Sequence, residues 1–293
     1  YDEFALNEIQ MAYLMGRDDN FELGGFSTHY YAEFETELDI DLFEKSINKA
    51  IKHHPMLRAV IQENGKQYVL EQCPYYKIEI EDLSQWTIED ANDYLIQERK
   101  KIEQRVFPLG SWPMFEIKAY KLSGNKYQIN FGIDVLVVDG ASLFLLADDI
   151  KKYYLGQDIA ELKFTFRDYS MALNDYKTKK QYENHKNYWM KKIDDFSPAP
   201  ALPLAIDPSL LKNPQFNRKE GMISKERWEK IKEAAKLHNV TAAGLLCTIY
   251  AKILSNWSGQ DKLAINTTVF KRHDFHEDVN KLIGDFTCII LLD

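Results

Sequence analysis

Asp134-Val-Leu-Val-Val-Asp139-Gly-Ala-Ser142 is the stretch of this sequence that says most about its fold and function. It places two carboxylates and a hydroxyl at the end of an apolar run, residues 131–138, which is typical of a strand buried on both faces. Acidic side chains are rarely buried unless they are paired or take part in function. The stretch therefore predicts the end of a core strand with a functional site beside it.

Two roles remain open for this pair of aspartates. Asp139 precedes Gly140-Ala-Ser142 and an apolar helical segment, so a helix N-cap is as well supported by the pattern as a catalytic role. Their odd spacing places two residues on opposite faces of a strand, so the carboxylates need not line one cleft. We therefore expect one carboxylate near the substrate and one holding structure, rather than a glycosidase-like acid/base pair.

Composition excludes several classes of protein. At 293 residues and 45% hydrophobic, the chain can bury a large core, and its formal charge of −8 disfavours nucleic acid as a partner. No apolar run approaches the roughly eighteen residues of a membrane span, and the first residues lack the features of a signal peptide. Cys73, Cys247 and Cys288 have no CxxC spacing, which argues against disulfides or a thiolate metal site. We expect a cytoplasmic protein, or a piece of one, without a membrane partner.

Patterning predicts an α/β (α+β) chain. Helices are expected over 7–16 (with Asn7 and Gln10 as a capping box), 39–53, 88–106, 143–154 and, as one long helix, 166–193. Strands are expected over 28–36, 57–61, 68–70, 77–80, 114–122 and 127–135, the last two joined by a hairpin turn at 123–125. Five prolines between 197 and 214 indicate a stiff connector and a lobe boundary near 180–215. Beyond it we predict helices over 225–237 and 241–257 and strands over 262–270 and 287–292.

The other polar clusters favour structural interpretations. His53-His54 lies at the C-terminal end of a predicted helix, where the helix dipole favours histidine. Arg58 begins an apolar strand, so we expect it to have an acidic partner. The run 273–278 has a His-x-x-His spacing but is polar throughout, which indicates a solvated loop. No metal ion is expected.

Six segments, in order along the whole chain, resemble the motifs of the condensation superfamily of nonribosomal peptide synthetases, and more narrowly of its heterocyclization domains. The matching segments are 4–17, 53–58, 134–142 (Asp-x-x-x-x-Asp-x-x-Ser), the proline-rich 198–204, the helical 241–257, and Gly284-Asp-Phe-Thr287 followed by 289–292. Ordinary condensation domains carry His-His-x-x-x-Asp-Gly at the third segment. The active histidine of the family falls on Val135, which can neither donate nor accept a proton, so general-base catalysis there is excluded.

The resemblance implies a two-lobed, chloramphenicol-acetyltransferase-like condensation fold with a tunnel between the lobes, the second lobe being incomplete in this chain. We expect an N-terminal lobe over 1–185 and a partial C-terminal lobe over 186–293, beginning with the proline-rich connector. The implied reaction joins a carrier-bound acyl or peptidyl donor to carrier-bound Cys, Ser or Thr and cyclodehydrates the product to a thiazoline or oxazoline. An acyltransferase that forms only the amide and a non-catalytic carrier-binding module are the alternatives.

The resemblance also implies roles for single residues. Asp134 and Asp139 would be the catalytic carboxylates, and Arg58 would pair with Asp139 as the equivalent residues do in the family. The tunnel would be lined by Gln10, Tyr13, Arg17, Ser142, Asp285 and Thr287. The domain would bind no cofactor itself, since upstream donor and downstream acceptor peptidyl carrier domains, beside an adenylation domain, would deliver phosphopantetheine thioesters. The family's seventh motif, with the Thr and Asp associated with cyclodehydration, would fall after Asp293.

Overall fold

The structure of the chain is a computed structural model that describes residues 2–21, 23–103, 105–211 and 219–293. It divides into two compact units. The first comprises Tyr1–Tyr182 and Phe270–Cys288, and the second Glu183–Val269 and Ile289–Asp293. The predicted lobes, 1–185 and 186–293, differ from these units because the chain returns to the first unit after residue 269.

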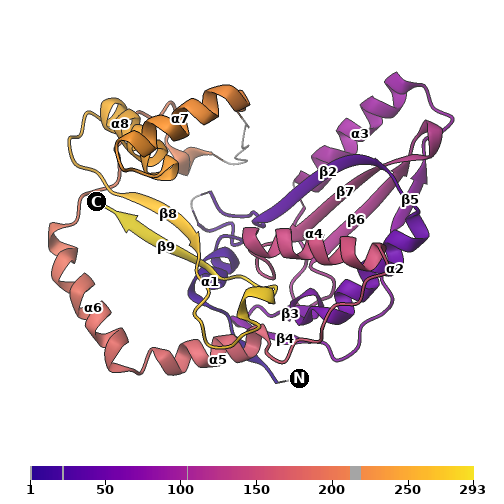
Figure 1. Ribbon diagram of the computed structural model, residues 1–293, viewed down its shortest axis with the longest axis horizontal. Helices are drawn as coiled ribbons and strands as arrows, with labels where there is room; N and C mark the ends of the chain where they lie inside the picture. Colours follow the sequence, from indigo (N-terminus) through magenta and orange to yellow (C-terminus); the bar gives the residue numbers. More distant parts are fainter. Residues whose placement is uncertain (1, 22, 104, 212–218) are drawn as a thin grey trace. The chain divides into compact units, whose positions relative to one another are not determined.

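The main sheet of the first unit has the strand order β2-β7-β6-β5 (Figure 1). β2 (His29–Glu37), β7 (Lys126–Asp134) and β6 (Phe115–Lys121) are antiparallel, and β5 (Glu79–Asp82) runs parallel to β6. The β6–β7 hairpin turns through the 3-10 segment Ser123–Asn125, where Gly124 has a φ of 75°. The predicted hairpin and the mixed α/β class are confirmed.

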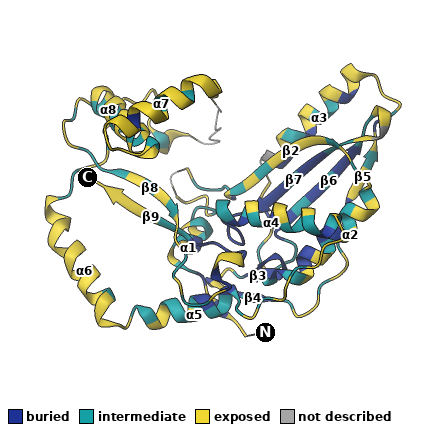
Figure 2. Ribbon diagram, viewed as in Figure 1, coloured by how far each residue is buried: buried dark blue, intermediate teal, exposed yellow. Residues whose placement is uncertain are grey.

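Two helices cover one face of this sheet. α2 (Ile40–His53) and α4 (Gly140–Tyr154) present apolar side chains to β6 and β7, whose buried residues are dark in Figure 2. Ile47, Ile51 and Leu146 surround the same small apolar space as Ile117 and Ile133. Burial of such a side chain stabilises the fold by about 1.5–3 kcal/mol. This layer is the core that holds the end of β7 in place.

The opposite face of the sheet is covered by α3 (Ile88–Glu103). Tyr120 of β6 is fully buried with Leu83 and Ala91, in a smaller apolar cluster of its own. Side chains alternate between the faces of a strand, so Tyr120 points away from the face that carries Ile117. The sheet is therefore packed on both faces, as the apolar run at β7 predicted.

β7 agrees with the strand predicted over 127–135 to within one residue, although the apolar residues continue to Val138. β7 stops at Asp134, and residues 135–138 form a buried turn closed by Val137 N–H to Asp134 O (3.2 Å) and Val138 N–H to Val135 O (3.4 Å). The Asp134 side chain also accepts from Leu136 N–H at 2.9 Å. Asp134 and Asp139 therefore do not lie on opposite faces of one strand, because a turn separates them.

A smaller antiparallel sheet of order β1-β4-β3 contains β1 (Phe4–Ala5), β4 (Lys66–Val69) and β3 (Ala59–Ile61), the last preceded by the 3-10 segment Pro55–Arg58. It adjoins α1 (Glu8–Met15), whose N-terminus carries the predicted capping box of Asn7 and Gln10. Gln10 is fully buried, and its amide donates to Leu136 O at 2.5 Å. Helix α1 is thereby tied to the turn that follows β7.

The single helix predicted over 166–193 is wrong. The structure has α5 (Phe166–Tyr176) and α6 (Lys180–Lys192), with 3-10 segment Ile193–Asp195 after the second. Between them, Thr178 N–H bonds to Asp175 O and Lys179 N–H to Tyr176 O, both at 3.0 Å. These shorter-range bonds replace the helical pattern and end α5.

The second unit contains the predicted helices α7 (Lys225–Leu237) and α8 (Ala242–Ser258), after the 3-10 segment Pro208–Leu210. Strands β8 (Ile265–Phe270) and β9 (Thr287–Leu292) pair with each other. Between them the chain returns to the first unit as Phe270–Cys288, here called the returning segment, which carries the 3-10 turn Val279–Lys281. Within the described residues, no single helix has the length and apolarity to cross a membrane. Only α7 and α8 together reach that threshold, and they are bent by 94° at their junction.

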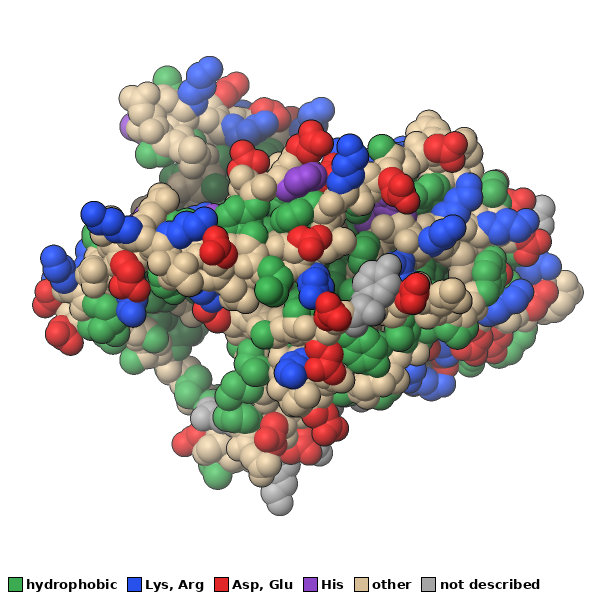
Figure 3. Space-filling model, turned by 90° about the horizontal axis from the view of Figure 1, so that it is seen from below, with side chains coloured by type: hydrophobic (Ala, Val, Ile, Leu, Met, Phe, Trp, Pro, Cys, Tyr) green, Lys and Arg blue, Asp and Glu red, His purple; other side chains and the backbone are tan. Residues whose placement is uncertain are grey.

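Charge on the visible surface is mixed. Figure 3 shows lysine and arginine side chains interspersed with acidic ones on one face, with apolar side chains between them. Exposed ion pairs, such as that of Lys126 with Glu35 at 2.8 Å, also occur in the described part of the chain. Phosphate binding requires clustered basic groups, so this face gives no support to a nucleic-acid partner.

We predict that Leu146→Ala lowers the free energy of unfolding by about 2–5 kcal/mol, because it empties space between α4 and the sheet. Phe144→Ala is the matched control on the same helix, since Phe144 is 81% exposed, and it should change stability by no more than about 0.5 kcal/mol. Urea unfolding followed by circular dichroism measures both. Equal losses in the two variants would contradict the packing described.

Candidate functional site

Asp134 is held at the end of β7 by a buried ion pair. It is 1% exposed, and its Oδ2 atom accepts from the Arg17 guanidinium and from the Ser27 hydroxyl. Arg17 also donates to Phe107 O at 2.7 Å. Burial raises the pKa of Asp134, while Arg17, Ser27 and the Leu136 amide oppose that rise. The structure thus brings together two predicted site residues, Arg17 and Asp134, and adds Ser27, which sequence reasoning missed.

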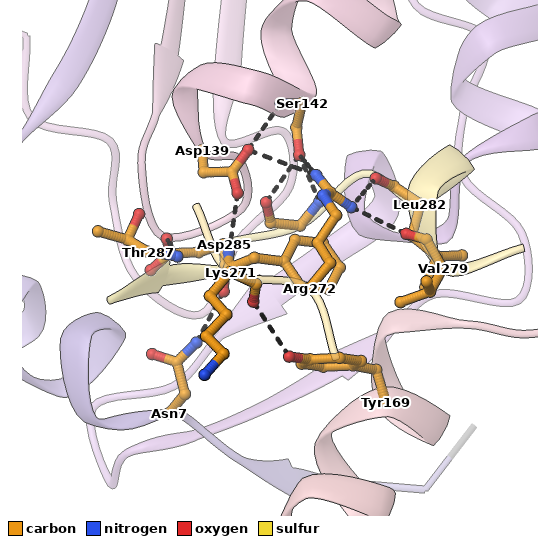
Figure 4. Close-up of polar contacts among 12 residues, drawn as sticks. Asn7, Asp139, Ser142, Tyr169, Lys271, Arg272, Val279, Leu282, Asp285 and Thr287 are labelled. Atoms are coloured by element: carbon orange, nitrogen blue, oxygen red, sulfur yellow. Dashed lines mark hydrogen bonds and ion pairs between the residues drawn. The ribbon is translucent and has the colours of Figure 1, made fainter. Parts of the chain in front are cut away.

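Asp139 is the N-cap of α4, as one of its two predicted roles required. Its Oδ1 atom accepts from Ser142 N–H at 2.6 Å, and its Oδ2 atom accepts from Phe286 N–H at 3.0 Å (Figure 4). Its own N–H donates to Gly284 O at 2.9 Å. The carboxylate therefore joins the start of α4 to the returning segment Phe270–Cys288.

The charged partner of Asp139 is Arg272, at 3.6 Å. Arg272 also donates to the Ser142 hydroxyl (2.9 Å) and to Val279 O (3.1 Å) and Leu282 O (2.8 Å), as Figure 4 shows. Its guanidinium lies 3.8 Å from the centroid of the Phe286 ring. An arginine fixed by an ion pair, several hydrogen bonds and a ring orders the whole returning segment.

The predicted pairing of Arg58 with Asp139 is corrected by this arrangement. Arg58 donates from Nη1 to Ile51 O and Lys52 O, and from Nε to Leu70 O at 3.1 Å. Ile51 and Lys52 lie in the last turn of α2, where backbone carbonyls lack helical partners and attract cations. Arg58 therefore ties the end of α2 to the chain beyond β4. Arg272, rather than Arg58, is the charged partner of Asp139.

Ser142 completes this network. Its hydroxyl donates to Gly284 O at 2.9 Å and accepts from Arg272, and it is fully buried. Gly140, two residues earlier, is a point of close approach: a Cβ there would lie 2.9 Å from both the Tyr30 hydroxyl and the Phe270 ring. A side chain at residue 140 would therefore require the ends of the Tyr30 and Phe270 side chains to move away.

Asp285 lies beside this network. It is 1% exposed; its Oδ1 atom accepts from Thr287 N–H at 3.0 Å, and its carbonyl accepts from the Asn7 side chain at 2.8 Å. Among the described residues its Oδ2 atom has no hydrogen-bond partner. Burial, with a smaller contribution from the charge of Asp139, raises the pKa of Asp285 to about 7.

The remaining predicted residues divide between the two clusters. Tyr13 is partly buried, and its pKa is raised by burial and then by Asp285, while Thr287 lowers it by hydrogen bonding. Gln10 contacts Leu136 O and the side chain of Gln67, so its role is to support the turn at 135–138. Val135, at the position of the family's histidine, is only 6% exposed.

Within the described residues, one group has the composition of a metal site. His53, His54 and Asp149 bring potential ligand atoms within 4.8 Å of one another. His54 Nε2 lies 3.1 Å from Asp149 Oδ2, and Lys152 Nζ lies 2.9 Å from Asp149 Oδ1. Because Asp149 already has two basic partners, this group is explained as a tie between α2 and α4.

The raised pKa of Asp285 predicts how stability varies with pH. The folded protein holds this proton more tightly than the unfolded chain, so the stabilising effect is complete below the ordinary pKa of 3.8 and is lost as the pH rises through about 7. We expect the urea midpoint of the wild type to fall relative to that of Asp285→Asn between about pH 4 and pH 8. Asp274→Asn, at an exposed position, is the control. Parallel pH profiles for the wild type and Asp285→Asn would contradict the prediction.

Comparison with known proteins agrees with this geometry. The Condensation domain family matches residues 1–292. The chain is 39% identical over 292 residues to Bacitracin synthase 1 of Bacillus licheniformis, covering 99% of this chain and 6% of that protein. It is 28% identical over 296 residues to Pyochelin synthetase PchF of Pseudomonas aeruginosa, covering 100% and 16%. It is 27% identical over 297 residues to Phenyloxazoline synthase MbtB of Mycolicibacterium paratuberculosis, covering 99% and 25%. The chain thus spans a quarter or less of the length of these relatives.

Solved structures show the same fold. The EpoB NRPS cyclization-docking bidomain from Sorangium cellulosum superposes with a TM-score of 0.91 at 27% identity, over 99% of this chain and 58% of that one. The first condensation domain of the CDA synthetase superposes with a TM-score of 0.72 at 16% identity, over 99% and 70%. The second likeness shows the fold alone. With the family match over residues 1–292, these findings show that the chain belongs to the Condensation domain family.

Proposed function

We propose that this chain is part of a heterocyclization domain of a nonribosomal peptide synthetase. In this proposal it joins a carrier-bound acyl or peptidyl donor to carrier-bound Cys, Ser or Thr, and then removes water to leave a thiazoline or oxazoline. Upstream and downstream peptidyl carrier domains deliver the substrates as phosphopantetheine thioesters, and the domain holds no cofactor itself. An adjacent adenylation domain supplies the acceptor.

The observation that carries the proposal is Asp134-Val135 in place of the two histidines of ordinary condensation domains. Val135 is buried and has no ionisable group, and Asp134 is already bound by Arg17 and Ser27. A base at the usual position is therefore missing, although the surrounding fold is that of the family. This substitution fits a site adapted to a different second step.

The named relatives support the same conclusion. Phenyloxazoline synthase MbtB is named for an oxazoline product, and the EpoB neighbour is described as a cyclization domain. Both cover 99% of this chain, and the EpoB structure has the higher TM-score of the two structures compared above. These similarities favour heterocyclization over simple amide formation.

The amide step needs little from a base. An α-amine is a competent nucleophile toward a thioester, and alignment of two tethered substrates can supply about 7–11 kcal/mol of the barrier. In this proposal the buried ion pairs of the first unit keep the site in one conformation, so that the two thioesters are held in alignment. The buried turn at 135–138 is held by Gln10 and Asp134, which both bond to Leu136, and by Thr28 O, which accepts from Val135 N–H at 3.1 Å.

Intact-mass spectrometry of the carrier-bound product tests the proposal. The synthetase that contains this chain, supplied with loaded donor and cysteine-loaded acceptor, should give a condensed product that is lighter by one water. An alanine-loaded acceptor is the matched control, because it has no side-chain nucleophile and should give only the amide. A cysteine product without loss of water would reduce the function to amide formation, and no condensation would favour a non-catalytic carrier-binding module.

A further inference from the structure

Two buried glutamines form a pair between the small sheet and α1. Gln67 lies in β4, the central strand of that sheet, opposite Phe4 of β1 and Ile61 of β3. Gln67 and Gln10 are both fully buried. Each amide donates to the other: Gln67 Nε2 to Gln10 Oε1 at 3.0 Å, and Gln10 Nε2 to Gln67 Oε1 at 3.2 Å. This reciprocal pair fixes the orientation of both side chains.

The other bonds of the pair reach the backbone. Gln10 Nε2 also donates to Leu136 O at 2.5 Å, and Gln10 Oε1 also accepts from Asn7 N–H at 3.0 Å. Gln67 Nε2 also donates to Ala5 O at 3.4 Å. Each of the two amide nitrogens thus makes two hydrogen bonds, which is the number of N–H groups that a primary amide carries. A buried polar network fixes one conformation when it is satisfied in this way.

Leu136 is the residue at which this network meets the turn after β7. Its N–H donates to Asp134 Oδ1 at 2.9 Å and its carbonyl accepts from Gln10, so side chains hold both of its backbone polar groups. The residue before it is Val135, at the position of the family's active histidine. Gln10 is oriented in turn by Gln67. A chain of hydrogen bonds therefore runs from the small sheet, through α1, to the turn that carries Val135.

We propose that Gln67 is a positioning residue for the condensation step, and that it acts through Gln10 to hold the turn after β7 in its working conformation. This inference rests on the proposed function, whose first step joins the two tethered substrates. That step depends on alignment, and a displacement of about 1 Å can slow such a reaction about 10²-fold. Gln67 is suited to this role because a central strand gives it a fixed position.

The variant Gln67→Glu separates positioning from packing. A protonated carboxyl group has one acceptor and one O–H donor, so it can reproduce the reciprocal pair with Gln10. A carboxylate has acceptors only, and one of its oxygens would face Gln10 Oε1. Burial disfavours the carboxylate and raises the pKa of such a group, so the variant should regain its function as the pH falls. Gln67→Met has a similar shape but cannot make the pair at any pH.

The test follows condensation by intact mass in the synthetase that contains this chain, as a single-turnover rate with loaded donor and cysteine-loaded acceptor. Each variant's rate is divided by the wild-type rate at the same pH, which removes the effect of groups that titrate in both. We expect Gln67→Met to be about 10–100-fold slower at every pH. Gln67→Glu should be as slow at about pH 8.5 and should recover most of the wild-type rate at about pH 6. Gln85→Glu, which adds the same charge at an exposed position, should match the wild type throughout.

Limited proteolysis of the same samples measures the folded fraction. A rate that falls only in proportion to the folded fraction would show a purely structural role and overturn the inference. A wild-type rate in Gln67→Met, or a ratio of Gln67→Glu to wild type that is constant with pH, would overturn it as well. If the wild type itself forms no condensed product, the proposed function has failed first.

Discussion

The carboxylate of Asp139 is the contact on which the site depends. It caps α4, binds the Phe286 amide and faces Arg272, so one side chain connects a helix start to a segment that follows it by more than a hundred residues in the chain. Ser142 and Gly284 reinforce the same junction through the Ser142 hydroxyl. Asn7 holds the same segment from another side, through the Asp285 carbonyl oxygen at 2.8 Å. Hydrogen bonds and an ion pair, as well as packing, therefore hold the returning segment in the first unit.

Burying several charges in one place is expensive, and the structure offsets that cost in different ways. Asp134 and Asp139 each face an arginine and accept hydrogen bonds on both oxygens, which is how buried carboxylates are tolerated. Asp285 has neither a cation nor a full set of donors, so its pKa rises instead. All three carboxylates are buried, as are the apolar residues of the turn at 135–138, and a buried environment strengthens electrostatic interactions. The result is one carboxyl group with a raised pKa beside two carboxylates that are paired with arginine.

Local features of this fold could be predicted from the sequence, because they depend on neighbouring residues. The capping box of Asn7 and Gln10, the N-cap at Asp139 and the hairpin at 123–125 are confirmed for that reason. The break between α5 and α6 is also local, but it follows from competing turn bonds at Thr178 that no apolar spacing reveals. The turn after β7 likewise depends on the Asp134 side chain, which accepts a hydrogen bond from Leu136 N–H although the apolar residues continue to Val138.

The site was harder to predict, because its contacts join distant parts of the chain. Family resemblance pointed to Arg17, Asp134, Asp139, Ser142 and Asp285, and the structure groups these residues into two clusters on either side of the same turn. It also pointed to Arg58 as the partner of Asp139, and this was wrong, since the carbonyls at the end of α2 attract that guanidinium. Arg272 stands in a polar stretch with no sign of burial, and Ser27 precedes a strand whose pairing with β7 the sequence does not specify.

A double-mutant cycle between Asp139 and Arg272 tests the central claim most directly. Asp139→Asn retains an N-cap and removes the charge, Arg272→Met removes the cation while keeping much of the stem, and urea unfolding gives the free energy for each variant and for the double variant. We predict a coupling free energy of about 1–3 kcal/mol, because the pair is buried and shares one network with Ser142. Additivity of the two single effects within about 0.5 kcal/mol would contradict the account, because the returning segment would then be held independently of this ion pair.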